Sequence, residues 1–300
     1  MELKQLALED KAVFDGYLRE RRHELAQYAF PNIYCWKKLF AIQWGVIEGA
    51  LCVFFRDPTG CFLYLPPLGA PPSAAMIWEC FAIMDAVNKN RRISRIENAE
   101  EPDLAGFLAL GLRHAPKSHD YIYSRAALSA LRGDLFKPKR AAVNRFIREN
   151  RFVCRPYQPA DKEQCLSLYK AWMRGRGETI PDPVYRGMLA DSLTSLEVIL
   201  DDFAALETAG LVVRVGSAIR AFTLGCALND DTFCVVFETA DLAVKGLSQF
   251  IFREFCARHE GFRSVNAMDD SGLENLKKVK MSYRPRLLAP AYIIDRADGQ

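Results

Sequence analysis

The stretch FETADLAVKG, residues 237–246, carries acids, a lysine and a glycine where an apolar strand gives way to a helix. Glu238 and Asp241 follow the apolar run TFCVVF, and Lys245 and Gly246 stand directly before a helical pattern. Because the first turn of a helix has backbone N–H groups without partners, a lysine and a glycine at that point can bind an anion. A polar connecting loop is the competing interpretation, and this stretch taken alone favours it.

A second candidate is a basic stretch with eight Lys and Arg residues against two acids. We predict a helix over residues 138–150 within it, because Pro138 suits a first helical turn. One face of this helix carries Arg140, Asn144 and Arg148 at a spacing of four. Such a cationic stripe suits a phosphate-bearing partner, and a solvated connector is an equal alternative. The eight basic residues are Arg132, Lys137, Lys139, Arg140, Arg145, Arg148, Arg151 and Arg155.

The opposite face of the predicted helix is apolar. Val143, Phe146 and Ile147 lie there and are expected to pack against the rest of the protein. Few aromatic residues are interleaved with the cations, so stacking on single-stranded bases is not expected.

The bulk composition is that of a soluble globular chain. Half of the 300 residues are hydrophobic, 26% are charged and the net charge is +3, so attraction to polyanions must come from local patches. The nine cysteines lack a C-x-x-C pair and are expected to be buried thiols in a reducing cytoplasm. The four histidines lack metal-ligand spacing, so no metal site is expected. The sequence shows no signal-peptide pattern and no apolar stretch long enough for a transmembrane helix. Contact with a membrane surface stays open.

An internal repeat organises the chain. From Gly45 and again from Gly210, the pattern predicts three strands, a helix, a fourth strand, a short helix and a last strand. The long helices are predicted near residues 73–90 and 246–259. Both copies place Asn-Ala and then acids after the fourth strand, at 98–101 and 266–270.

We therefore predict two units. The first covers residues 1–130, a basic linker helix and the first strand of the second unit cover 131–160, and the second unit with a helical insert covers 161–300. Inside the insert, RGRGETIPDP at 174–183 predicts a loop.

A three-strand meander followed by a helix and two further strands resembles the GNAT acyltransferase fold, an α+β fold in which the splayed fourth and fifth strands open a cleft for an acyl donor. Two such units in tandem resemble the peptidoglycan-bridge aminoacyltransferases and the C-terminal domain of phosphatidylglycerol lysyltransferase. The stretches 120–146, 216–225, 237–246 and 276–285 carry the second resemblance. Members of that family often have an arginine after the asparagine of the second unit's fourth strand, and here Ala267 is a departure.

This resemblance implies roles for the acids and the asparagine. Glu238 and Asp241 would bind the α-ammonium group of an aminoacyl donor or act as general base, with Asp269 and Asp270 next in line. Asn266 would hydrogen-bond the ester carbonyl.

The cationic stretch that ends the second copy, residues 277–286, differs from the apolar helix in the first copy. We therefore expect the second unit to hold the donor-side anion site, with Lys277 or Lys280 on phosphate and the Tyr283 hydroxyl at its edge.

The donor is expected to be an aminoacyl-tRNA. An acyl-CoA enzyme of this fold binds pyrophosphate through a loop Q/R-x-x-G-x-G/A, and residues 243–248 match it by half, with Ala243 in place of Gln or Arg. No cofactor is therefore expected, although coenzyme A stays an alternative. A tRNA has no pyrophosphate to bind, and the two basic stretches can follow its phosphodiester backbone.

Three functions stay open in order of preference. The first moves an aminoacyl group from tRNA to an amine or hydroxyl acceptor, which can be a small molecule, a peptide or a lipid head group. The second is an acyl-CoA-dependent N-acyltransferase. The third is a non-catalytic protein that binds an anionic ligand or a peptide.

Overall fold

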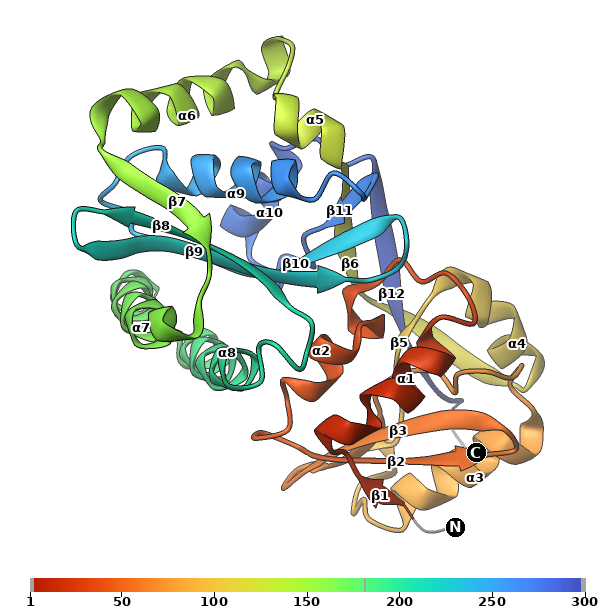
Figure 1. Cartoon of the computed structure of the whole chain (residues 1–300). Coiled ribbons are helices and arrows are strands. Elements are labelled where there is room, and N and C mark those ends of the chain that lie inside the picture. The colour runs from red at the N-terminus through yellow and green to blue at the C-terminus, as the bar shows by residue number, and fades with distance from the viewer. Residues whose placement is uncertain (1–2, 181, 298–300) are drawn as a thin grey trace. The chain divides into compact units, whose positions relative to one another are not determined.

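The chain divides into two compact units (Figure 1). A computed structural model describes residues 3–180 and 182–297. The first unit comprises Met1–Tyr121, Met268–Lys277 and Leu288–Gln300, and the second comprises Ile122–Ala267 and Lys278–Leu287. Neither unit is one continuous stretch of the chain, because two segments from its last part, Met268–Lys277 and Leu288–Gln300, belong to the first unit.

The first copy of the repeat contains the element order that the sequence predicts, β2–β3–β4–α3–β5–α4–β6, after an N-terminal strand and two helices. The strands are β1 (Lys4–Gln5), β2 (Ala41–Ile47), β3 (Ala50–Asp57), β4 (Gly60–Leu63), β5 (Ile96–Ala99) and β6 (Leu112–Ser124). The helices are α1 (Lys11–Leu18), α2 (Phe30–Tyr34), α3 (Ala74–Asp85) and α4 (Leu104–Ala109), with 3₁₀ turns at Leu8–Asp10, Ala26–Tyr28, Arg91–Ile93 and Glu101–Asp103.

The second copy repeats the order as β8–β9–β10–α9–β11–α10–β12, which confirms the repeat. Its strands are β7 (Phe152–Pro156), β8 (Ala209–Val215), β9 (Ala218–Ala227), β10 (Thr232–Ala240), β11 (Ser264–Asn266) and β12 (Leu287–Arg296). Its helices are α5 (Arg125–Ala130), α6 (Lys137–Glu149), α7 (Lys162–Thr179), α8 (Pro183–Asp201), α9 (Leu247–Arg258) and α10 (Glu274–Met281), with 3₁₀ turns at Asp134–Phe136 and Pro159–Asp161.

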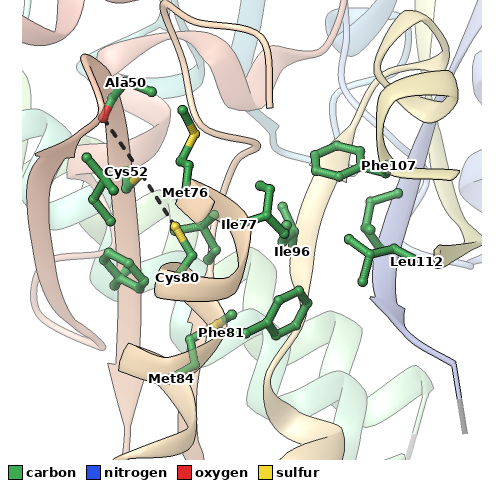
Figure 2. Packing of buried hydrophobic residues seen from close by; sticks show 14 of the residues in the cluster. Ala50, Cys52, Met76, Ile77, Cys80, Phe81, Met84, Ile96, Phe107 and Leu112 are labelled. Carbon is green, nitrogen blue, oxygen red and sulfur yellow. Dashed lines mark hydrogen bonds between the residues drawn. The ribbon is translucent and has the colours of Figure 1, made fainter. Parts of the chain in front are cut away.

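The core of the first unit lies between α3 and its sheet. Ser73 caps α3, since its hydroxyl accepts a hydrogen bond from the Met76 N–H at 3.1 Å. Figure 2 shows the buried side of the helix, where Cys80 meets Cys52 of β3 with 3.6 Å between the two sulfurs. Both are free thiols, and eight of the nine cysteines are buried, as the apolar context of the cysteines predicts.

The sheet of the second unit opens at β10 and β11. These strands are parallel neighbours over three residue pairs, from Thr232↔Ser264 to Cys234↔Asn266. Beyond that point β10 continues to Ala240 beside β9, with a bulge between Val235 and Phe237, while β11 has ended. Within residues 3–180 and 182–297, therefore, no strand pairs with the second half of β10 on its β11 side.

The last strands of the two repeats are exchanged in part, since β12 from Leu288 onward lies in the first unit and the end of β6, from Ile122, lies in the second. In the first unit the strand order is β1-β2-β3-β4-β5-β12-β6, so a strand from the second copy lies beside β5, with Tyr292 opposite Ala99. In the second unit the end of β6, from the first copy, pairs antiparallel with β11, and β10, β9, β8 and β7 follow. Each sheet is therefore mixed and mainly antiparallel, and each is completed by the other repeat.

The predicted basic helix is confirmed as α6, which packs on α9 in the second unit. Val143 and Phe146 are buried as expected, but Ile147 is 45% exposed. The expectation for Ile147 was wrong because a further step of 100° from Phe146 turns the side chain out of the contact.

The loop predicted at 174–183 is also shorter in the structure. Helix α7 continues to Thr179 and α8 begins at Pro183, while Pro181 lies outside the described residues. The two glycines of this stretch are tolerated because Gly175 and Gly177 lie within a long helix that packs on α8 and β9. None of the helices in the described ranges combines the length and the apolar character that crossing a membrane would need.

Candidate functional site

Glu238 lies in the part of β10 that β11 leaves without a partner strand. The residue is partly exposed, but its Oε2 atom is buried and has no hydrogen-bond partner among the described residues. Burial raises the pKa of the Glu238 carboxyl to about 8, and the positive charge of Lys280 opposes that rise. A carboxyl in this state can donate or accept a proton close to neutral pH.

Lys280 and Tyr283, from the end of α10 and the segment after it, lie near this carboxyl. The Lys280 ammonium donates to the Ala267 carbonyl at 2.5 Å, and the Tyr123 hydroxyl donates to the Lys280 carbonyl at 3.0 Å. Burial and then the negative charge of Glu238 raise the pKa of the Tyr283 hydroxyl. These contacts hold an ammonium group and a phenol close to the carboxyl.

Lys139 reaches the same place from α6. Its ammonium lies over the Tyr283 ring, 4.0 Å from the ring centroid, and burial lowers its pKa. The sequence placed Lys139 in the basic stretch as a candidate phosphate-binding residue, and in the structure its ammonium lies against the Tyr283 ring. Lys139, Glu238, Lys280 and Tyr283 therefore lie close together, and Cys256 of α9 is a further neighbour of Glu238.

Sequence reasoning missed Cys256. This thiol is buried on α9, and burial followed by the charge of Glu238 raises its pKa, so it is a neutral neighbour and not a thiolate. The signal was available, since Cys256 falls on the apolar side of α9 together with Phe252 and Phe255. Asn266 is also fully buried, as the last residue of β11 opposite Cys234.

Asp241 lies past the end of β10 and is ion-paired. Its Oδ2 atom is 2.8 Å from the Arg220 guanidinium, and its Oδ1 atom accepts a hydrogen bond from the Ala243 N–H at 2.9 Å. Both Asp241 and Arg220 line a cavity of about 420 Å³ against α7, whose other walls are largely apolar. Sequence reasoning did not find Arg220 or this cavity, because the partner of Asp241 is 21 residues away on β9.

The glycine before α9 has a packing role. Gly246 has φ +81°, and a Cβ atom there would lie 2.1 Å from the Ala142 carbonyl oxygen of α6. A glycine is therefore required for the close approach of the two helices, with or without an anion at this helix start. Lys245 beside it is exposed.

The three residues of the predicted stripe on α6 differ in their surroundings. Arg140 donates hydrogen bonds to the carbonyl groups of Leu131 and Gly133, which fixes the turn before the helix. Asn144 is exposed, and the exposed Arg148 lies 3.2 Å from Glu149. Arg140 thus serves the local backbone, while Asn144 and Arg148 face solvent.

Three further predicted residues belong to the first unit. Asp269 accepts a hydrogen bond from the Ser271 N–H, and Lys277 lies 3.6 Å from Glu274. Asp270 accepts a hydrogen bond from the Tyr121 hydroxyl at 2.5 Å. The structure therefore brings together Lys139, Glu238, Lys280 and Tyr283 in the second unit and does not include Asp269 or Lys277 in that unit.

The sequence of nearly the whole chain matches one protein family. Residues 19–295 fit the model described as "Phosphatidylglycerol lysyltransferase, C-terminal". The chain belongs to this family. No curated protein matches it.

Solved structures of other proteins share the fold of this chain. A conserved protein of unknown function from Bacteroides thetaiotaomicron is 24% identical, with a TM-score of 0.87 and coverage of 98% of this chain and 99% of that one. L-PGS from Bacillus licheniformis is 13% identical, with a TM-score of 0.66 and coverage of 97% and 93%. A tandem GNAT protein from the clavulanic acid biosynthesis pathway is 11% identical, with a TM-score of 0.51 and coverage of 97% of each chain.

These likenesses confirm the predicted fold class of two tandem GNAT-like units. In the second unit β10 and β11, its fourth and fifth strands when β7 is counted as the first, pair over three residues only.

Proposed function

We propose that this protein transfers an aminoacyl group from aminoacyl-tRNA to an amine or hydroxyl acceptor, with Glu238 as the general base. The observation that carries the proposal is the buried Glu238 carboxyl, with its pKa near 8, at the opening between β10 and β11. A base is most effective when its pKa lies near the working pH, so this carboxyl is suited to taking a proton from an attacking amine.

The proposed step needs no covalent intermediate on the enzyme. The acceptor nitrogen attacks the ester carbonyl carbon, a C–N bond forms and the C–O bond to the ribose breaks. One proton leaves the nitrogen for Glu238 and is then passed to the ribose oxygen that departs, so the carboxylate is regenerated. The Lys280 ammonium and the Tyr283 hydroxyl, both beside Glu238, are the groups suited to stabilise the oxyanion in between.

The surface of the second unit supports a polyanionic donor. Arg132, Lys137 and Arg151 are exposed on and beside α6, within the basic stretch. Coenzyme A is the weaker donor candidate, because the glycine of its half-matched loop is already required by the contact of Gly246 with α6. A binding role without catalysis would leave the raised pKa of Glu238 without a use.

Two measurements test the proposal. The first is the affinity for bulk tRNA across a series of salt concentrations. The second is the rate at which a pool of charged tRNA loses its amino acids when the protein and amine acceptors are present. We expect affinity to fall steeply with salt, and the double variant Lys137→Gln, Arg151→Gln to lower the salt slope by about 2, roughly one for each cation. Glu238→Gln should slow deacylation by about 100-fold and leave tRNA affinity unchanged.

Arg174→Gln is the matched charge control, because Arg174 is exposed on α7 outside the basic stretch. Thermal stabilisation by acetyl-CoA together with no affinity for tRNA would overturn the proposal and favour the acyl-CoA reaction. A Glu238→Gln protein that still deacylates tRNA at the original rate would remove Glu238 from its role.

A further inference from the structure

The cavity against α7 has one charged pair and otherwise uncharged walls. Leu168 and Trp172 of α7 form one side, and Ile219 of β9 and Leu242 after β10 form the other. Arg220 and Asp241 are the charged residues in its lining. At about 420 Å³ the cavity lies in the size range of small-molecule sites.

Three hydrogen bonds hold the charged pair, in which the Arg220 side chain is 46% exposed and that of Asp241 21%. A backbone hydrogen bond from the Asp241 N–H to the Arg220 carbonyl, 2.7 Å, accompanies the 2.8 Å ion pair of the side chains. The Ala243 N–H fixes the other oxygen of Asp241 at 2.9 Å. The pair therefore costs a ligand little ordering of the protein on binding.

Both members of the pair have further hydrogen-bonding capacity. A carboxylate has about four lone-pair sites, of which the hydrogen bonds from Arg220 and Ala243 occupy two, and a guanidinium has five N–H donors. A ligand's ammonium can bind Asp241 while its carboxylate binds Arg220, so that the four charges alternate in sign. The pair need not separate for this.

The balance of charge selects the class of ligand. A phosphate-bearing molecule would meet a single cation that Asp241 already neutralises, and a simple cation would meet a carboxylate that Arg220 already neutralises. A zwitterion is neutral overall and matches a neutral site. Its uncharged part would lie on Trp172, Leu168 and Ile219.

We propose that this cavity is a binding site for a small zwitterion with an apolar body, such as an apolar α-amino acid. The site is separate from the proposed base, because Asp241 lines the cavity against α7, whereas Glu238 lies near Cys256 of α9 and Lys280. Binding at this site does not depend on the proposed transfer reaction.

The experiment is calorimetric titration of the whole protein, without tRNA, with L-leucine and L-phenylalanine. L-leucinamide, which lacks the carboxylate, and N-acetyl-L-leucine, which lacks the ammonium, are the paired probes. We expect saturable binding of both amino acids and binding of each paired probe weaker by about tenfold or more, or about 1.4 kcal/mol. Glycerol 3-phosphate should not bind.

Three variants test the walls. Arg220→Gln, Asp241→Asn and Trp172→Ala should each lower the affinity for L-leucine by about tenfold or more, while the affinity for tRNA stays unchanged. Arg263→Gln is the matched control, because Arg263 forms an exposed ion pair with Asp231 outside this lining. Thermal melting of each variant without ligand checks that it is folded.

Each outcome bears on the site directly. Absence of amino acid binding, or leucinamide binding as tightly as leucine, overturns the proposal. Glycerol 3-phosphate binding that depends on Arg220 overturns it in favour of a phosphate-bearing ligand. Leucine binding that is weakened by changing Arg220 or Asp241, and not by Arg263→Gln, supports the site.

Discussion

At the scale of single residues, Glu238 has a consequence for stability that does not depend on any substrate. Its pKa is raised from 4.5 to about 8 in the folded protein, so between these values the folded state keeps a proton that the unfolded state has lost. Stability that is present below pH 4.5 is therefore lost as the pH rises toward 8. We expect the free energy of unfolding to fall by about 3 kcal/mol over this window, allowing for partial solvent access.

Glu238→Gln removes this loss, because glutamine resembles the protonated carboxyl and does not titrate. Urea denaturation at a series of pH values from 5 to 9 measures it, with Glu163→Gln, a change at an exposed position on α7, as the control. The difference between the Glu238 variant and the original protein should widen with pH and that of the control should not. Parallel curves for all three proteins would contradict a buried Glu238 carboxyl with a raised pKa.

The sequence indicated Glu238 and Asp241 as a pair of acids, but not their different surroundings. A spacing of three is odd, so near a strand the two side chains tend to leave it on opposite faces. One lies near α9 and Lys280 and the other lines the cavity against α7. Which acid is buried depends on the helices that cover each face, and a strand's own pattern contains no information on those.

At the scale of elements, the contact between α6 and α9 depends on one glycine. Gly246→Ala would place a methyl group 2.1 Å from the Ala142 carbonyl oxygen, in addition to the strain of φ +81°. We expect a loss of about 3 kcal/mol or more, since neither helix backbone can yield cheaply. Chemical denaturation measures this loss.

Gly216→Ala provides the matched control, because Gly216 has φ +65° and nothing within 4 Å of the added methyl group. It isolates the backbone strain alone, about 1 kcal/mol. Equal losses for the two variants would mean that α6 does not press on Gly246 as described.

The elements also show where sequence reasoning succeeds and stops. Helical periodicity predicted α6 to within about one residue at each end, because Val143 and Phe146 repeat on one face. Periodicity predicts which face of the helix is buried but not how wide the buried face is, and Ile147 lies outside the contact. The partner helix, and therefore the reason for Gly246, arises from tertiary packing.

At the scale of the whole molecule, the exchange of last strands could not be predicted from the repeat. The sequence shows two copies of one element order, and both copies end in a strand of similar character. Pairing a last strand within its own copy or with the other copy uses the same residues and the same pattern. Only long-range contacts decide between them, such as the antiparallel register of Tyr292 with Ala99.

The exchange predicts which part of the protein Arg296 stabilises. Arg296 ends β12, in the second copy, and its guanidinium donates to both oxygens of Asp85 of α3, at 2.7 and 2.8 Å. The pair is mostly buried, so Arg296→Gln leaves the Asp85 carboxylate with only the Ser94 hydroxyl and the more distant Arg91 guanidinium and should cost about 3 kcal/mol. In hydrogen exchange, protection should fall in β2–β5, α3 and β12 and stay unchanged in β7–β10 and α9, because Asp85 belongs to the first unit.

Asp295→Asn is the control within the same strand, since it removes an exposed ion pair with Arg113 and should cost less than about 1 kcal/mol. Were β12 to stabilise the unit formed by its own copy, Arg296→Gln would instead reduce protection in β10, β11 and α9. That pattern would contradict the exchange. A loss confined to the first unit would mean that neither unit is encoded by one continuous half of the chain.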